Sequence, residues 1–136
     1  FGLADDNCFK WITPLSTTTI AMHMKLDTAN SNLTVSGTVT SYSDLRLKTN
    51  LEVIPNALDK INQVSGYTFD RIDIDMPRKT GVVAQEIEKI LPEAVSEDEN
   101  GMKSVAYGNI VGILIEAIKE LNTKVENLEK QLALNS

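Results

Sequence analysis

The sequence divides at residues 43–50, which read SDLRLKTN. Before this stretch the chain is polar and alternates between apolar and polar residues, a pattern typical of β-strands. After it the chain reads as mixed helix and strand, and then as one long helix. Ser43 and Lys48 place a hydroxyl near an amine, which is the minimum for a serine–lysine nucleophile pair. The alternative is a turn capped by Ser43 and Asp44, with its basic residues in water.

The composition is that of an ordinary globular protein. Its 136 residues are 42% hydrophobic and 24% charged, which predicts one domain with a modest core. The net charge of −6 argues against a nucleic-acid partner, because phosphate binding relies on clusters of Lys and Arg. No window reaches the roughly 18 apolar residues of a membrane span. With one cysteine, Cys8, and one histidine, His23, we expect no disulfide, metal site or cofactor.

Residues 1–42 are predicted to be β-rich. Alternation is clearest at residues 33–41, a weaker run covers residues 21–26, and residues 30–32 fit a turn between them. About 40 residues with few large apolar side chains bury little surface alone. We therefore expect these strands to pair with other chains, as in a fibre shaft. One sheet of a monomeric domain is the alternative.

Residues 43–107 are predicted to form a small α/β core. The expected elements are a strand at 45–54, a short helix from Pro55 to Gly66, a strand at 67–70, a buried strand at 81–83 and a helix at 84–91 that Pro92 ends. The polar segment at 71–79 is either an exposed hairpin or an arm on a partner surface. Residues 96–101 read as an acidic turn.

Residues 108–133 carry an unbroken heptad pattern, which predicts a coiled-coil helix. Lys124 at a g position and Glu129 at the following e position can pair between parallel helices. The β-branched residues at a, with Leu at d, favour two helices in peptides. The predicted seam comprises Val111, Leu114, Ile118, Leu121, Val125, Leu128 and Leu132.

Five blocks of the sequence occur in an order that is specific as a set. They are SDxRLKxN at 43–50, GVVAQE at 81–86, LPEAV at 91–95, VAY at 105–107 and IEAIKEL at 115–121. In these blocks the chain resembles the C-terminal intramolecular chaperone domain of phage tail fibres and tail spikes, the self-cleaving domain of the phage endosialidases. The resemblance runs from Ser43 to about Leu132 and leaves out residues 1–42.

The resemblance implies an α+β fold in an intertwined homotrimer. Residues 1–42 would end a fibre shaft and residues 43–136 would be the chaperone and autoprotease domain, with the coiled coil at its C-terminal end. The partners would be two further copies and the upstream shaft. The parent fibre would belong to a phage virion tail, and the chaperone would act in the bacterial cytoplasm during assembly. The dimer that the heptad favours stays open.

The expected cleavage site is the bond between Tyr42 and Ser43. Ser43 would attack the Tyr42 carbonyl and Lys48 would act as general base, with Asp44 orienting the site or stabilising a turn. Arg46 or a backbone amide would hold the oxyanion. Because an unperturbed lysine has a pKa of about 10.4, burial or a neighbouring cation would have to keep Lys48 neutral.

The spacing of Ser43 and Lys48 does not bring them together in regular structure. Five residues apart, they lie on opposite faces of a strand and about 140° apart around a helix. Either a turn reverses the chain between them, or the working lysine comes from a neighbouring subunit.

Three other functions stay open on the sequence. The first is a structural trimerisation or fibre-tip domain that does not cleave. The second is a self-cleaving domain of a membrane-tethered transcription factor, which the missing membrane span and basic segment disfavour. The third is a conventional hydrolase, which one histidine, few aromatic residues and no glycine-rich loop disfavour most.

Overall fold

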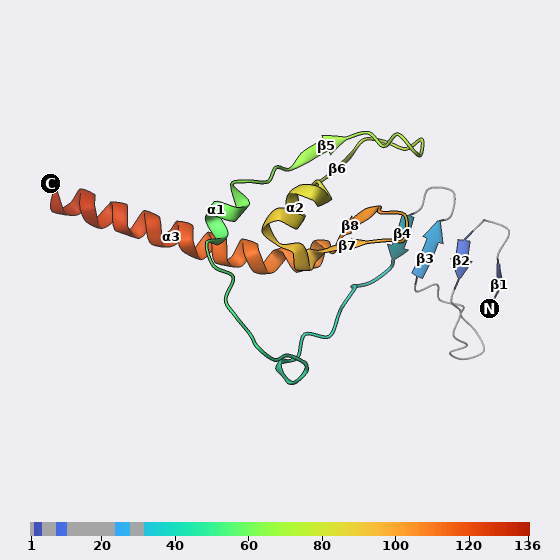
Figure 1. Ribbon diagram of the computed structural model, residues 1–136, viewed down its shortest axis with the longest axis horizontal. Helices are drawn as coiled ribbons and strands as arrows, with labels where there is room; N and C mark the ends of the chain where they lie inside the picture. The colour runs from blue at the N-terminus through green and yellow to red at the C-terminus, as the bar shows by residue number, and fades with distance from the viewer. Residues whose placement is uncertain (1, 4–7, 11–23, 28–31) are drawn as a thin grey trace. The chain divides into compact units, whose positions relative to one another are not determined.

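The computed structural model describes residues 2–3, 8–10, 24–27 and 32–136. The structure is mixed α+β, as predicted, with small antiparallel sheets and a long C-terminal helix (Figure 1). It forms two compact units. The first comprises Phe1–Thr49 and Asp70–Pro77, and the second comprises Asn50–Phe69 and Arg78–Ser136.

The described part of the first unit contains a sheet of short antiparallel strands. They follow chain order: β1 (Gly2–Leu3), β2 (Cys8–Lys10), β3 (Met24–Asp27) and β4 (Asn32–Val35). The strand predicted at 33–41 is shorter than expected, because the chain bends at Ser36 and Gly37, where glycine weakens a strand. Residues 21–23 and 30–31, which belong to the other predicted strand and turn, lie outside the described residues.

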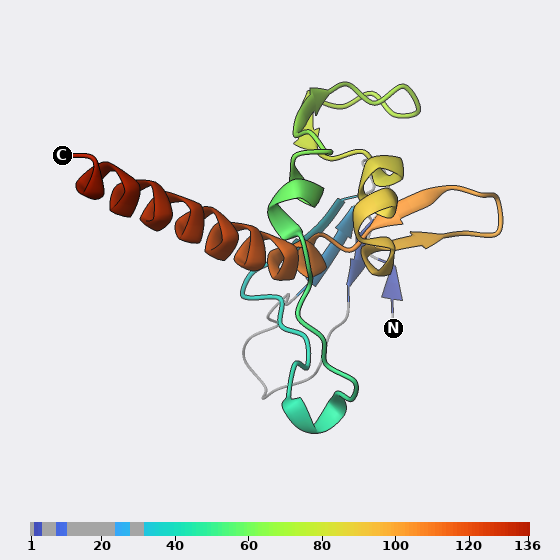
Figure 2. The ribbon, with the colours of Figure 1, turned by 60° about the vertical axis from the view of Figure 1, so that its left-hand side comes forward.

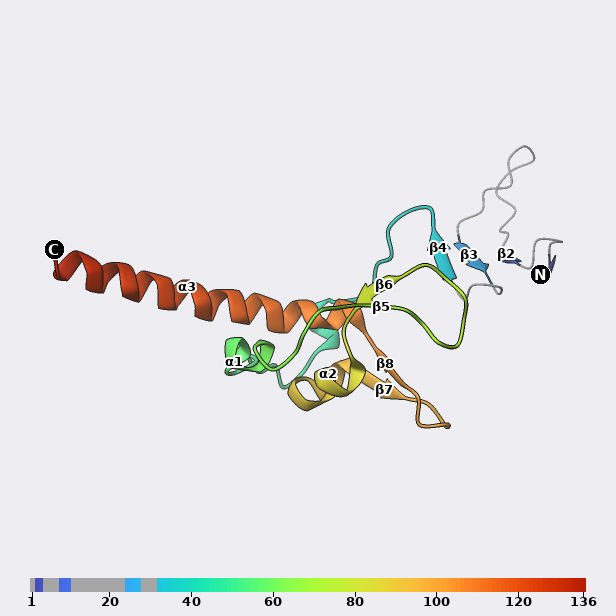
Figure 3. The ribbon, with the colours of Figure 1, turned by 90° about the horizontal axis from the view of Figure 1, so that it is seen from above.

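The core of the second unit lies where α1 (Ala57–Ile61) packs beside the first half of α3 (Ile110–Leu134), as Figures 1 and 3 show. Two small residues, Ala57 and Ala117, let the helices approach closely. They are buried with Ile113 and with Ile90 of α2 (Ala84–Ile90). Partly buried apolar residues pack against this cluster: Ile54, Leu58, Ile61, Val64, Leu91 and Ile110.

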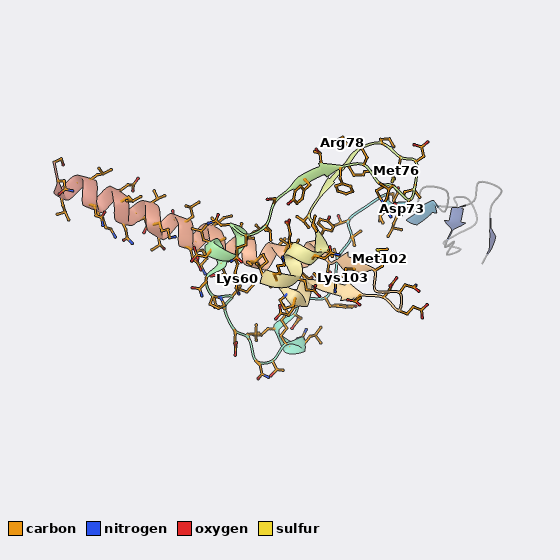
Figure 4. All side chains as sticks on the ribbon, turned by 45° about the horizontal axis from the view of Figure 1, so that its top comes forward. Lys60, Asp73, Met76, Arg78, Met102 and Lys103 are labelled. Carbon is orange, nitrogen blue, oxygen red and sulfur yellow. The ribbon has the colours of Figure 1, made fainter. Side chains whose placement is uncertain are left out.

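Two hairpins complete the second unit. One pairs β5 (Tyr67–Phe69) with β6 (Lys79–Gly81), so the polar segment predicted at 71–79 connects two paired strands. The other pairs β7 (Val95–Glu97) with β8 (Lys103–Val105) through the acidic turn. Lys103, which is labelled in Figure 4, joins this hairpin to α2, since its Nζ contacts Glu97 and lies 2.8 Å from Glu88 Oε1.

The helices predicted at 84–91 and 108–133 are confirmed within about two residues, whereas two predicted strands are wrong. Residues 45–54 form a 3₁₀ turn, η1 (Leu45–Leu47), followed by chain without regular structure, and Asn50 has a φ of 51° that no strand contains. The strand expected at 81–83 ends at Gly81, because the backbone N–H of Val82 donates to the Tyr107 hydroxyl at 3.3 Å instead of to a neighbouring strand. α1 ends at Ile61, short of Gly66, and a 3₁₀ turn, η2 (Pro92–Ala94), follows α2 at Pro92.

The N-terminus of α1 is capped from a distant part of the chain. Asn56, the residue before the helix, has a left-handed backbone and makes no capping bond with its side chain. Glu120 of α3 replaces that cap, because its two carboxylate oxygens accept from the backbone N–H groups of Ala57 at 2.8 Å and Leu58 at 2.9 Å. These bonds hold the pKa of Glu120 below its ordinary value.

We predict that Glu120→Gln lowers the thermal midpoint at neutral pH by roughly 5 °C, a shift typical of a lost helix cap. A depressed carboxyl pKa stabilises the fold above the unfolded value, about 4.3 for Glu. That stabilisation disappears as the pH falls through the folded value. Thermal unfolding followed by circular dichroism should therefore show the two chains converging as the pH falls toward 2.

Glu126→Gln is the matched control, since the Glu126 carboxylate accepts from Asn122 on the same helix and caps no other element among the residues that the structure describes. Its thermal midpoint should stay close to that of the wild type throughout. If Glu120→Gln lowered the thermal midpoint by the same amount from pH 7 to pH 2, that result would contradict the capping role of the ionised carboxylate.

Candidate functional site

A tight turn follows the bond between Tyr42 and Ser43. Two backbone hydrogen bonds close η1, from Leu47 N to Asp44 O at 3.1 Å and from Lys48 N to Leu45 O at 3.0 Å. Asp44 caps the turn, because its Oδ1 accepts from the backbone N–H of Arg46 at 2.8 Å. Figure 2 shows η1 as the short teal turn in the loop that precedes α1.

This turn places Lys48 against Ser43 in the same chain. Lys48 Nζ donates to Ser43 Oγ at 2.8 Å, across five residues of sequence. The geometry is that of the intrachain turn, one of the two arrangements that the spacing left open. Both side chains are exposed in the single chain.

Asp44 and Arg46 lie beside this pair and bind each other. Arg46 Nε donates to Asp44 Oδ1 at 2.9 Å, and Arg46 Nη2 donates to Oδ2 at 2.8 Å. The hydrogen bonds from Arg46 hold the pKa of Asp44 below its ordinary value, and the carboxylate raises the pKa of Arg46. The sequence predicted supporting roles for both residues, but their mutual bidentate contact has no signature in the spacing alone.

The residue before the turn, Tyr42, is 96% exposed. It lies in a stretch without regular structure and lines a shallow hollow with Thr40 and Ser41. The bond between Tyr42 and Ser43 is therefore neither protected by a sheet nor buried in the single chain.

The predicted seam of α3 is also uncovered in the single chain. Its seven residues are between 42% and 70% exposed, although all are large and apolar. The buried residues of α3, Ile113 and Ala117, belong to a neighbouring face that packs against α1. Beyond that contact, the C-terminal half of α3 extends away from the other elements of the second unit (Figure 3).

A set of apolar side chains that the sequence assigned to a strand is exposed as well. Leu45 and Leu47 on η1 are 70% and 68% exposed, and Leu51 and Val53 farther along are 63% and 72% exposed. Their alternation predicted burial in a sheet, but this chain supplies no such sheet among the residues that the structure describes.

Other kinds of site have less support. Within the described ranges, no group of three or more His, Cys, Asp or Glu residues could hold a metal ion. None of the helices described is both long enough and apolar enough to cross a membrane.

Comparison with known proteins places the turn at the start of a recognised domain. Residues 43–96 match the protein family described as the chaperone of endosialidase, whose name also designates it a peptidase. The match begins at Ser43, the first residue after the bond predicted to be cut.

The similar curated proteins are phage tail fibres. The chain is 37% identical over 98 residues to the long tail fiber protein Gp37 of Enterobacteria phage K3, an alignment covering 66% of this chain and 8% of that protein. It is 33% identical over 99 residues to Gp37 of Enterobacteria phage M1, covering 66% of this chain and 39% of that protein. Gp37 of Salmonella phage S16 is 28% identical over 122 residues, an alignment covering 77% of this chain and 16% of that protein.

The chain thus spans only a small part of these long fibre proteins, 8% in the case of phage K3. The resemblance predicted from the sequence is confirmed: residues 43–96 of this chain match the chaperone domain of the endosialidase family.

Proposed function

We propose that this chain is the C-terminal part of a phage tail fibre, in which an intramolecular chaperone assembles three copies and then cuts itself off. Residues 1–42 are the end of the fibre shaft and residues 43–136 are the chaperone. The contact between Lys48 Nζ and Ser43 Oγ at 2.8 Å, directly after an exposed peptide bond, carries the proposal. The family match beginning at Ser43 supports it independently.

The assembly function rests on the α3 seam. A continuous apolar stripe that stays largely exposed in the described part of its own chain is stabilised when identical helices bury it in a coiled coil. Lys124 and Glu129 fall at g and following e positions, so they pair between parallel helices. The family resemblance implies three helices, in preference to the two that the a and d residues favour in peptides.

A chaperone of this kind solves a kinetic problem of fibre shafts. Strands shared between chains pair slowly and expose edges that aggregate while they wait. Helices form locally and fast, and joining three chains at one end raises the effective concentration of the segments to be paired. Once the helper is cut off, the shaft lacks its folding aid and becomes kinetically trapped.

The cleavage chemistry uses the turn residues directly. Neutral Lys48 accepts the Ser43 hydroxyl proton while Ser43 Oγ attacks the carbonyl carbon of Tyr42. The bond from that carbon to the Ser43 nitrogen breaks, the nitrogen takes a proton, and an ester joins Tyr42 to Ser43 Oγ. Water hydrolyses the ester, leaving a carboxylate on Tyr42 and restoring the Ser43 hydroxyl. The atoms balance without a metal or cofactor.

Assembly is proposed to switch this chemistry on. Lys48 is a base only when it has lost its proton, and removing the amine from water favours that neutral form. In one chain Ser43 and Lys48 are exposed, as are Leu45 and Leu47 between them. A neighbouring copy that covers these leucines would remove water from the pair, so that cutting follows trimer formation.

The test is the intact mass of the purified 136-residue chain over time at pH 8, beside sedimentation equilibrium. Two fragments that meet between Tyr42 and Ser43, formed from a trimer, support the proposal. An uncut chain that still assembles supports the second candidate, a structural trimerisation domain, which the exposure of the pair in one chain favours. A monomer that is never cut at micromolar concentration would exclude both.

A further inference from the structure

The Asp44 carboxylate makes two kinds of hydrogen bond beside the Ser43–Lys48 pair. Through its bond to the backbone N–H of Arg46 at 2.8 Å it caps the turn that brings Lys48 to Ser43. Through both of its carboxylate oxygens it binds the Arg46 guanidinium at 2.9 and 2.8 Å. The fork of Arg46 is therefore directed at Asp44.

The charge of Asp44 also reaches Lys48. In the described part of the chain two cations lower the pKa of the Asp44 carboxyl. They are Arg46, by hydrogen bonding, and Lys48, more weakly, by charge. A carboxylate close to an amine opposes the loss of a proton from that amine. An unpaired Asp44 would therefore oppose the proton transfer that the proposed cleavage needs.

We propose that Asp44 and Arg46 are positioning residues of the cleavage site: Asp44 closes the turn, and Arg46 neutralises Asp44 so that its charge does not keep the proton on Lys48. This inference rests on the proposed self-cleavage and adds how the base is kept available at moderate pH. Arg46 acts through Asp44 and not on the reacting atoms.

The pH dependence of cleavage separates the two roles. In the full chain, Arg46→Gln leaves the Asp44 charge unpaired, so the pH of half-maximal rate should rise while the maximal rate is largely kept. Asp44→Asn keeps an amide oxygen for the turn but removes the negative charge and frees the Arg46 cation, so the same midpoint should fall. The double variant should return toward the wild type, as expected for residues that act on each other.

Loss of the cap that Asp44 provides to η1 should lower the maximal rate of cleavage and not shift the pH of half-maximal rate. Asp44→Ala removes both the charge and the acceptor that closes η1, so the reacting groups are no longer held in place. The maximal rate should fall by about 10²-fold, the loss typical of an ångström-scale misplacement. Circular dichroism and sedimentation should show that the fold and the assembly are kept.

The chain offers a matched control in a second arginine–aspartate pair. Arg71 Nε donates to Asp73 Oδ1 at 2.8 Å and its Nη2 contacts Oδ2, with the same separation of two residues. Arg71→Gln removes the same charge and the same kind of contact. It should leave both the midpoint and the maximal rate of cleavage unchanged.

A titration that needs no cleavage distinguishes this inference from the proposed function. In the uncut Ser43→Ala chain, the NMR signals of the Lys48 side chain, assigned by their absence in Lys48→Arg, should titrate at higher pH with Arg46→Gln and at lower pH with Asp44→Asn. Opposite shifts support the inference even if no chain is ever cut, in which case the self-cleavage proposal fails alone. Shifts in the same direction, or none, overturn the inference even if the wild type cuts fully.

Discussion

Ser43→Ala is expected to leave the chain whole, with the same fold and oligomeric state as the wild type before cleavage. The substitution removes only one heavy atom, the attacking oxygen, which is 2.8 Å from Lys48 Nζ. Cleavage should fall by about 10⁴-fold or more, the loss typical of removing a nucleophile. Intact-mass measurement over several days at pH 8 checks it.

Ser41→Ala is the matched control, because Ser41 lies on the other side of the bond and is also exposed. It should be cut between Tyr42 and Ser43 at the wild-type rate. A Ser43→Ala chain cut at that bond would assign the cleavage to a contaminating protease and remove Ser43 from the mechanism.

The same experiment extends to the lysine. Lys48→Arg keeps a positive donor near Ser43 but cannot supply a neutral base, because guanidinium stays charged. It should be uncut at every pH, whereas the wild type should cut faster as the pH rises. A wild-type rate that is constant from pH 5 to pH 9, together with an active Lys48→Ala, would exclude this lysine.

Co-expression then asks which chain supplies the lysine. Because the hydrogen bond between Lys48 and Ser43 lies within one chain, mixed assemblies of Ser43→Ala and Lys48→Ala chains of distinguishable mass should stay uncut. A cut in the Lys48→Ala chain would show that a neighbour provides the lysine and would contradict the intrachain pair.

Leu121→Asp is expected to abolish assembly. Leu121 occupies a d position near the middle of the seam and is half exposed in the single chain. In a parallel trimer the substitution would bury three unpaired carboxylates in one layer, at a cost of several kcal/mol per charge, on the order given for buried ions. Sedimentation equilibrium in the Ser43→Ala background should find a monomer at micromolar concentration.

Thr123→Asp controls for the added charge. Thr123 lies on the same helix outside the seam, where its hydroxyl donates to the carbonyl of Lys119 at 3.1 Å. Its helix propensity is close to that of aspartate. This variant should assemble like the wild type. Assembly of Leu121→Asp to the same extent as Thr123→Asp would refute the seam.

The sequence was sufficient for the elements whose signal is local. α3 and α2 follow from apolar residues repeated at three and four positions, a pattern set by neighbours along the helix itself. The family blocks likewise identified the domain from their order along the chain, because each block is a short run of adjacent residues. The sequence also marked Ser43 and Lys48 as the candidate pair, because both lie in the SDxRLKxN block at the boundary between the β-rich region and the α/β region.

The path of the chain from Ser43 to Ile54 could not be predicted from such local patterns. Alternating leucines and valines predict a strand, but a strand also needs a partner that supplies hydrogen bonds, and periodicity does not report whether one exists. Here the capping bond of Asp44 and the left-handed backbone of Asn50 turn the chain instead. That turn is what converts an unfavourable spacing of five residues into a contact.

The sequence by itself therefore determined the long helix with its apolar stripe, the helix at 84–91, and the candidate pair of Ser43 and Lys48. Only the tertiary structure decided which face of α3 packs inside the chain, since apolar residues occupy two neighbouring faces and, in the described part of the chain, the buried residues of α3 are Ile113 and Ala117. It also decided that Glu120 caps a helix 63 positions away in the sequence. The physical reason is that helix periodicity arises from residues within four positions of each other. Whether a helix face finds a packing partner, a helix end finds a distant cap, or an alternating segment finds a strand to pair with depends on where the rest of the chain lies.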